Sequence, residues 1–257
     1  MNYKNICIIG YPKSGNTWLA RMVSKALKIQ VKIFVDDSGV PEVAADINTL
    51  IKESKSKVYK LHLYPYEFKK KYQKSNTYVI YIYRDPKSVF ISSFFYFNYK
   101  GAGKYVMKKM LLNNPIDCLK WIIGRYKLSL FLDSFLKQGL HTYGLHSMHI
   151  NAWSSFGKGN DKFVMVDYND LIANPEKALK NLFSTLKLQV DSSDISKAAE
   201  SEEFGRRKLE IINSKAEDLT FGKEFNVKFL RSGDINDWKN YLTERQALLI
   251  DKELKVF

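Results

Sequence analysis

Short apolar runs recur along this chain, and each has the length and composition of a β-strand. The first run is uninterrupted, as in a strand that is buried on both faces of a parallel sheet. The later ones are rich in β-branched and aromatic residues, which favour strands. The pattern predicts strands at residues 6–9, 58–63, 77–83 and 163–166.

Helical periodicity follows the first strand and separates the later ones. Beyond residue 9 and a short loop, apolar residues recur every three or four positions, as one buried helix face requires. These residues are Leu19, Met22, Val23, Ala26 and Leu27. Asp85 and Pro86, after the third strand, are preferred at a helix cap and first turn. Asn174-Pro175-Glu176 predicts a further helix start.

Strands that alternate with helices predict a doubly wound α/β fold, in which helices cover both faces of a central parallel sheet. No repeat, low-complexity tract or Pro/Gly-rich linker interrupts the 257 residues, so we expect a single domain over residues 1–257. Ligands of such folds gather at the carboxyl ends of the strands. The side chains predicted there are Lys13, Lys60, His62, Arg84 and Tyr168. Their convergence indicates one shared anion site.

The composition adds a strong positive charge to this picture. The 41 Lys and Arg residues outnumber the 27 Asp and Glu residues and give a net charge of +14. This charge favours anionic partners such as nucleotides, sulfated or phosphorylated substrates, acidic glycans, lipid headgroups or nucleic acid. Two cysteines, Cys7 and Cys118, argue against a disulfide framework. Without a membrane-spanning run or a signal-peptide pattern, we expect a cytoplasmic protein.

The histidines do not form a metal-binding pattern. They lie at positions 62, 141, 146 and 149, away from any clustered cysteines. His146 and His149 are three residues apart, so they share one face of a helix, but no further ligand lies nearby in the sequence. We therefore expect no metal site.

The loop after the first strand nearly matches a nucleoside-triphosphate phosphate loop. Gly10 and Gly15 have the spacing of G-x-x-x-x-G-K-[ST], and Thr17 supplies the hydroxyl. Asn16 stands where the lysine belongs, and the lysine lies inside the loop at position 13. A helix that begins here directs backbone N–H groups at an anion. The displaced lysine indicates an anion other than ATP or GTP, and the alternative is a plain turn with a surface lysine.

Three segments resemble the sulfotransferases that use 3′-phosphoadenosine 5′-phosphosulfate (PAPS). Residues 11–18, YPKSGNTW, look like the 5′-phosphosulfate loop of that family, and residues 83–92, YRDPKSVFIS, look like its 3′-phosphate segment. Residues 231–233 and 237–240 are similar to its late R-K-G and G-D-W-K-N elements. The resemblance implies a P-loop-like fold of the bacterial or cytosolic type. It also implies metal-free transfer of the PAPS sulfuryl group to a hydroxyl, or less readily an amine, with release of 3′-phosphoadenosine 5′-phosphate (PAP).

The resemblance also implies catalytic roles. A cation beside the bridging oxygen of the departing phosphate stabilises charge that develops in the transition state, and Lys13 is the candidate. His62 would take the acceptor proton as general base, with Lys60 assisting the sulfuryl oxygens. These two residues lie in a segment similar to K-T-H-L-P, which Tyr64 interrupts. Ser92 completes the catalytic set. For His62 the alternative is a structural histidine at a strand end.

A larger set of residues would bind the nucleotide. The loop backbone holds the 5′-phosphate, a guanidinium and a hydroxyl grip the 3′-phosphate, and aromatic rings contact adenine. The set is Lys13, Ser14, Gly15, Asn16, Thr17, Trp18, Arg84, Ser92, Tyr168, Phe204, Arg231, Ser232 and Gly233. Ser232 departs from the family, which commonly has a second cation there. For the aromatic residues Trp18, Tyr168 and Phe204, core packing is the alternative.

The acceptor is the least constrained part of this reading. Segment 100–137 carries eight basic and two acidic residues among apolar ones. It is either a basic amphipathic surface for an anionic lipid, glycan or glycopeptide, or ordinary helices with a core face. The acceptor class stays open among glycans, lipids, glycopeptides and small molecules, as do peripheral contact with an anionic membrane and the oligomeric state. We expect no nucleic-acid partner.

Two other classes of protein compete with a sulfotransferase. A phosphate-loop kinase would use the same first turn, but it would place a lysine at position 16 and supply a carboxylate for a metal. A non-enzymatic basic protein that binds nucleotides or membranes would explain the net charge. Such a protein has no need for Lys13, His62 and Arg84 together at the ends of strands.

Overall fold

The computed structural model describes residues 5–29, 31–34, 41–42, 56–71, 77–98, 127–140, 143–213 and 233–255. Within these ranges the strands form one sheet in the order β3-β2-β4-β1-β5-β6, in which only the β2 and β3 pair is antiparallel. The strands are β1 (Ile6–Ile9), β2 (Val31–Phe34), β3 (Pro41–Glu42), β4 (Val58–Leu61), β5 (Tyr78–Tyr83) and β6 (Phe163–Asp167). The four predicted strands are confirmed, with β4 ending earlier than expected. The strands β2 and β3, the last two at one end of the sheet, were not predicted.

Helices fill the connections between the strands. They are α1 (Asn16–Leu27), α3 (Pro65–Lys71), α4 (Pro86–Asn98), α7 (Leu128–Gln138), α8 (His146–Gly157), α9 (Tyr168–Ala173), α10 (Pro175–Thr185), α11 (Ser192–Ser201), α12 (Phe204–Asn213) and α14 (Glu244–Glu253), with a 3₁₀ turn η3 at Asp237–Asn240. Two predicted helix starts are confirmed. The carboxylate of Asp85 accepts the N–H groups of Lys87 and Ser88 at α4, and the amide oxygen of Asn174 accepts that of Lys177 at α10.

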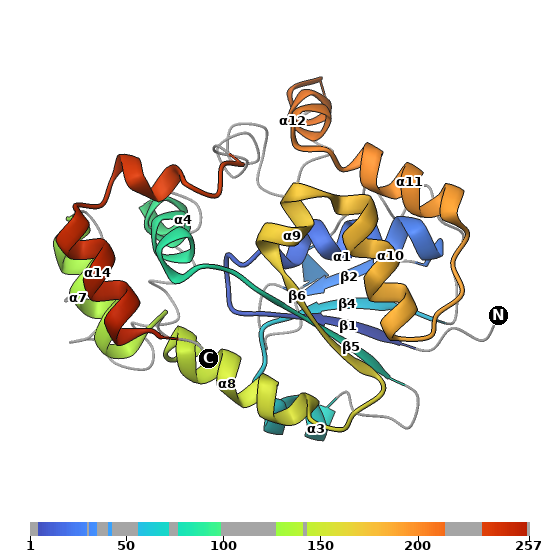
Figure 1. Ribbon diagram of the computed structural model, residues 1–257, viewed down its shortest axis with the longest axis horizontal. Helices are drawn as coiled ribbons and strands as arrows, with labels where there is room; N and C mark the ends of the chain where they lie inside the picture. The colour runs from blue at the N-terminus through green and yellow to red at the C-terminus, as the bar shows by residue number, and fades with distance from the viewer. Residues whose placement is uncertain are drawn as a thin grey trace.

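The sheet is covered on both faces, which confirms the doubly wound architecture. Alternate residues of β1 point to opposite sides, as the pleat requires. Ile6 and Ile8 join a core with α1, α10 and α11, whereas Cys7 and Ile9 join a core with α3 and α8. Figure 1 shows these two groups of helices on opposite faces of the sheet. Cys7 is a free, fully buried thiol, as expected for a small core residue.

A third cluster of apolar side chains lies among α4, α7 and α14, which gather beside the sheet (Figure 1). Tyr11 of the loop after β1 belongs to this cluster, and α7 contributes Phe131, Leu132 and Phe135. The part of segment 100–137 that forms α7 is therefore an ordinary helix with a core face, while its residues 100–126 lie outside the described ranges. None of the helices placed by the structure is long and apolar enough to cross a membrane.

Candidate functional site

The loop between β1 and α1 leaves the start of the helix open to a ligand. Lys13 and Gly15 both adopt left-handed conformations, with φ of 71° and 100°. A Cβ at Gly15 would lie 2.6 Å from the Tyr168 ring, so both the backbone and the space require glycine. No side chain caps α1, its first turn holds no acidic residue, and Leu19 makes the first backbone bond, to Gly15. The preceding N–H groups are suited to bind an anion.

Asn16, at the position of the missing lysine, ties this loop to β4. Its Nδ2 donates to the Gly10 carbonyl at 2.9 Å and lies 3.4 Å from the Leu61 carbonyl. Its Oδ1 and the Ser14 hydroxyl are buried without a hydrogen-bond partner in the part of the chain that the structure describes. Buried polar atoms are rarely left unpaired, so these two atoms point to a bound polar ligand.

His62 follows β4 and lies against the same loop. Its Nδ1 is 2.7 Å from the Gly10 carbonyl, and a carbonyl only accepts, so Nδ1 carries the proton. The Nε2 atom of the neutral ring is then unprotonated and able to accept a proton. Burial, followed by the positive charge of Lys60, holds the pKa of His62 well below its ordinary value. The imidazole is therefore neutral near pH 7.

The strand ends of β1, β5 and β6 meet as predicted. Arg84 Nη1 donates to the Lys13 carbonyl at 3.3 Å. The Arg84 guanidinium lies 4.1 Å above the Tyr168 ring, which in turn packs against Gly15. The Lys13 ammonium is 4.0 Å from the centre of the Tyr96 ring on α4. The predicted anion-binding side chains therefore lie together at one end of the sheet.

The remaining predicted residues of this end are Lys60, Thr17 and Ser92, which are buried or half-buried. Lys60 is buried in β4, in register with Ile8 of β1, and its charge acts on His62. Thr17 is half-buried in the first turn of α1, and Ser92 is half-buried on α4, two turns beyond Arg84. Thr17 is thus on the helix that leaves the loop, and Ser92 is on the helix that follows β5.

The two histidines of α8 lie behind the site and face the strands. His149 Nε2 is 3.2 Å from the His62 carbonyl, and His146 Nε2 is 3.1 Å from the Arg84 carbonyl. Burial lowers the pKa of His146 to about 3 and that of His149 to about 4, so both rings are neutral at pH 7. The predicted placement of the two histidines on one helix face is confirmed, and each ring donates a hydrogen bond to a backbone carbonyl. Among the described residues no three His, Cys, Asp or Glu side chains are grouped to hold a metal ion.

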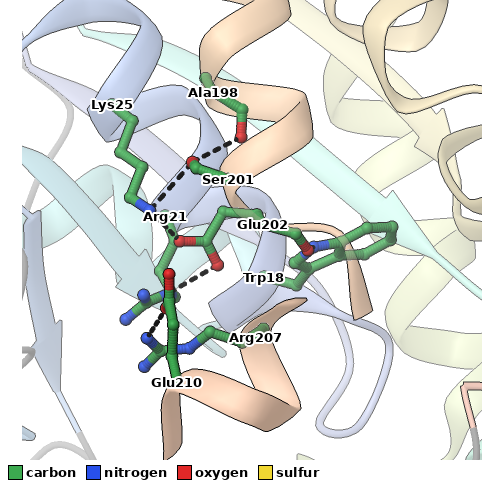
Figure 2. Close-up of polar contacts among 8 residues, drawn as sticks. All are labelled: Trp18, Arg21, Lys25, Ala198, Ser201, Glu202, Arg207 and Glu210. Atoms are coloured by element: carbon green, nitrogen blue, oxygen red, sulfur yellow. Dashed lines mark hydrogen bonds and ion pairs between the residues drawn. The ribbon is translucent and has the colours of Figure 1, made fainter. Parts of the chain in front are cut away.

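Trp18 is held at the other side of the loop by Glu202, the residue that directly follows α11. The indole Nε1 donates to the Glu202 carbonyl at 2.7 Å, and the ring meets Tyr168 edge to face at 6.0 Å. The Glu202 carboxylate, only 1% exposed, lies 2.8 Å from Arg21 Nε and 2.6 Å from Lys25 Nζ. Figure 2 shows the three α1 side chains converging on this one residue. We call Trp18, Arg21, Lys25 and Glu202 the ionic cluster.

Phe204 begins α12 two residues after Glu202 and contacts the late glycine of the resemblance. Gly233 has a φ of 70°, and a Cβ there would lie 2.9 Å from the Phe204 ring. These two predicted residues therefore meet, and the ionic cluster connects them to α1. Arg231 and Ser232 lie outside the described residues, so their roles stay predictions.

Sequence reasoning missed several residues that shape the site. Glu202 and Arg21 are 181 positions apart, and no local pattern marks residues at that separation as partners. Tyr81, which bonds to His149, reads as one more aromatic residue of a strand. The spacing of His146 and His149 did provide a signal, but it suggested a shared helix face without revealing what the face contacts.

Comparison with known proteins agrees with this geometry. The family model described as "Sulfotransferase domain" matches residues 4–255. Rat sulfotransferase 2A6 is 26% identical over 258 residues, which cover 97% of this chain and 82% of the relative. The guinea pig 3-alpha-hydroxysteroid sulfotransferase is 25% identical over 252 residues, which cover 95% and 80%.

Solved structures show the same fold. Mouse sulfotransferase SULT7A1, crystallised with PAP, superposes with a TM-score of 0.67 at 22% identity, over 98% of this chain and 84% of that one. Retinol dehydratase, in complex with androsterone and PAP, gives a TM-score of 0.63 at 14% identity, over 99% and 80%. Neither the kinase nor the non-enzymatic alternative is favoured by these matches. Because the family model covers almost its whole length, the chain belongs to the sulfotransferase family.

Proposed function

We propose that the site at the carboxyl ends of β1, β4 and β5 transfers the sulfuryl group of PAPS to a hydroxyl acceptor and releases PAP. Membership of the sulfotransferase family fixes the reaction class, and the residue roles are the proposal. One observation carries it above the others. The His62 Nδ1 bonds to the Gly10 carbonyl at 2.7 Å, so a neutral base lies directly against the loop that presents the α1 N-terminus.

The residues present suit the phosphosulfate end of PAPS. The uncapped N-terminus of α1 offers several backbone N–H groups, and the buried Ser14 hydroxyl has no partner among the described residues. Lys13 adds a positive charge within the loop. Such a combination of helix end, hydroxyl and cation binds anionic oxygens.

Sulfuryl transfer forms one bond to sulfur, breaks another and moves one proton. A bond forms between the acceptor oxygen and sulfur while the bond from sulfur to the bridging phosphate oxygen breaks. Lys13 stabilises the negative charge that this bridging oxygen gains, which lowers the barrier because the charge is larger in the transition state. His62 accepts the proton of the acceptor hydroxyl at Nε2. Lys60 and Ser92 complete the proposed catalytic set.

Two groups of residues bind the rest of the nucleotide, one at the 3′-phosphate and one at adenine. Arg84 and Ser92 bind the 3′-phosphate, with the paired donors of the guanidinium suited to phosphate oxygens. Trp18 and Phe204 stack on adenine, and Tyr168 contacts its edge. The ionic cluster supports this assignment, since Glu202 bonds to Trp18 and directly precedes the turn into Phe204.

The acceptor in our proposal bears a hydroxyl group. The names of the guinea pig 3-alpha-hydroxysteroid sulfotransferase and of the androsterone complex of retinol dehydratase support a hydroxyl-bearing small molecule. The family match over residues 4–255 supports one domain for the whole chain. The cytoplasmic location stays a prediction of the sequence, and contact with anionic membranes and the oligomeric state stay open.

Thermal shift measurements with PAP, and separately with ATP and Mg²⁺, test the proposed function. We expect PAP to raise Tm, because a ligand at one hundred times its Kd stabilises the native state by about 2.7 kcal/mol. Preference for ATP, or no response to either nucleotide, would contradict the proposal. A screen with ³⁵S-labelled PAPS across steroids, phenols, glycans, lipids and glycopeptides then identifies the acceptor class.

A further inference from the structure

A buried tyrosine and a buried histidine beneath His62 form a directional chain of hydrogen bonds. The hydroxyl of Tyr81 lies 2.8 Å from His149 Nδ1, and His149 Nε2 lies 3.2 Å from the backbone carbonyl of His62. A carbonyl only accepts, so the proton of His149 is on Nε2, and Nδ1 must accept from Tyr81. Both side chains are fully buried, and water does not compete for these bonds.

The other end of the chain reaches the phosphosulfate loop. The Tyr81 oxygen accepts a hydrogen bond from the backbone N–H of Tyr11. The chain therefore runs from Tyr11 N–H to Tyr81, from Tyr81 to His149, and from His149 to the His62 carbonyl. Burial lowers the pKa of His149 to about 4, so the ring stays neutral and keeps this order of protons at pH 7.

The same peptide group of the loop is bonded at both of its ends. The carbonyl of Gly10 accepts from His62 Nδ1 at 2.7 Å, and the N–H of the next residue, Tyr11, donates to Tyr81. These two groups belong to one planar peptide unit. One path joins this unit to the His62 ring, and the other joins it through Tyr81 and His149 to the His62 backbone. The two paths close a circuit that fixes the ring relative to the loop.

We infer that His149 and Tyr81 are positioning residues, which hold the His62 imidazole in register with the phosphosulfate loop through the Gly10–Tyr11 peptide. This inference rests on the proposed function, because it gives His62 the role of base. A misplacement of about 1 Å at a reacting group costs up to about a hundredfold in rate. The circuit therefore matters for turnover more than for nucleotide binding.

The test compares two substitutions of similar size at position 149. His149→Met removes the N–H that bonds to the His62 carbonyl, whereas His149→Gln retains a terminal N–H close to the position of Nε2. We expect kcat of His149→Met to fall about 10- to 100-fold and that of His149→Gln to stay within about threefold of the parent. The Kd for PAP should stay within about twofold in both variants. Turnover is measured as PAP formed from PAPS with the strongest acceptor of the ³⁵S screen.

Tyr81→Phe keeps the ring and removes only the hydroxyl, which provides a second variant should His149→Met not fold. His149 Nδ1 then loses its donor, so fewer bonds hold the ring in place, and we expect kcat to fall about tenfold. Long-range ¹H–¹⁵N spectra of ¹⁵N-histidine protein report the tautomers directly. The parent should show a proton on His149 Nε2 and on His62 Nδ1, and Tyr81→Phe should keep both protons while the signal of His149 Nδ1 shifts, because that atom loses its hydrogen bond.

The outcomes separate this inference from the proposed function. If His62→Ala is inactive while folded His149→Met and Tyr81→Phe both turn over like the parent, the positioning role is wrong and the base role stands. If His62→Ala itself turns over normally, the base role is wrong and the inference fails with it. Equal losses in His149→Met and His149→Gln, together with lowered Tm, would mean that His149 only packs.

Discussion

The two sides of the phosphosulfate loop are held by opposite kinds of interaction. On the β4 side, His62, Tyr81 and His149 are joined by uncharged hydrogen bonds, with both histidine rings neutral at pH 7. On the α1 side, the ionic cluster buries the Glu202 carboxylate between Arg21 and Lys25. We call the first group the neutral relay. The loop thus has one side where we propose proton transfer and another side that anchors distant segments.

The contrast has a physical reason. A base must keep a free lone pair, and burial together with the nearby positive charge of Lys60 lowers the pKa of His62 and keeps its ring neutral, so uncharged hydrogen-bond partners with a fixed order of donors suit this side. Charges serve the other side because Glu202 must hold α11 and the start of α12 against α1. A buried ion pair adds little net stability compared with apolar packing, but losing one partner is costly. The ionic cluster therefore fixes how α11 and the start of α12 pack against α1, and adds little to the free energy of unfolding.

The largest effect is expected on the relay side. His62→Ala should lower kcat by about 10² to 10⁴, the usual contribution of a general base. The Kd for PAP should change little, because the loop backbone and Arg84 remain. Initial rates with PAPS, together with calorimetric titration of PAP, measure the two quantities on one preparation.

Trp18→Ala is the matched variant on the other side of the loop. It removes a ring that we assign to adenine binding, so the binding free energy of the nucleotide should weaken by about 1–3 kcal/mol. The KM for PAPS and the Kd for PAP should rise accordingly, while kcat changes less. Loss of kcat without loss of PAP affinity would contradict this assignment, because Trp18 would then act in turnover and not in adenine binding.

The next effect concerns the stability of the ionic cluster. Glu202→Gln leaves the cations of Arg21 and Lys25 without their counter-charge, and we expect the free energy of unfolding to fall by about 3–5 kcal/mol. The affinity for PAP should fall as well, because the Trp18 indole loses its fixed acceptor when the end of α11 shifts. Urea unfolding and calorimetric titration measure the two losses.

The control for this variant replaces the charges by apolar groups. Arg21→Met combined with Glu202→Leu removes both buried charges, and it should recover much of the stability lost in Glu202→Gln. Lys25 is 22% exposed and can turn to water. If the double variant is less stable than Glu202→Gln, the Arg21–Glu202 ion pair itself adds to the free energy of unfolding, beyond fixing how the helices pack.

The sequence predicted the sheet and the meeting of its strand ends because both depend on local pattern. Ile6 to Ile9 show a buried strand directly, and parallel strands bring their carboxyl ends to one edge, so Lys13, His62 and Arg84 had to lie near one another. The strand β3 was missed because two residues carry too little pattern, and β2, VKIF, was missed although its apolar residues on either side of Lys32 offered a signal. Partners such as Glu202 and Arg21 were missed because their contact depends on how whole helices pack.

The dependence of stability on pH should separate the two sides further. The pKa values of His146 and His149 are lowered on folding to about 3 and about 4, so the unfolded chain binds more protons below its ordinary histidine pKa. Their contribution is complete above about pH 6.5 and is lost as the pH falls toward 4, at about 1.4 kcal/mol per pH unit for each ring. Urea unfolding at pH 7, 6 and 5 measures this slope.

His149→Gln provides the control for the pH prediction, because it removes one titrating ring and keeps a donor to the His62 carbonyl. Between pH 6 and 5, the slope of the free energy of unfolding against pH should fall by about 1.4 kcal/mol per pH unit, the contribution of one histidine. An unchanged slope would mean that His149 is exposed to water or charged in the native state, and the order of protons in the neutral relay would then be wrong.

The smallest effect is expected at a helix cap remote from both sides of the loop. Thr243 and Gln246 form a reciprocal capping box at the start of α14, with the Thr243 N–H donating to Gln246 Oε1 at 2.9 Å. Thr243→Ala should lower the free energy of unfolding by about 1 kcal/mol and leave kcat and the Kd for PAP unchanged. This variant shows how much activity responds to a loss of stability alone. If kcat falls in proportion to stability here, the losses expected for His149→Met and Glu202→Gln cannot be assigned to positioning, whereas a constant kcat makes those losses specific to the relay and the ionic cluster.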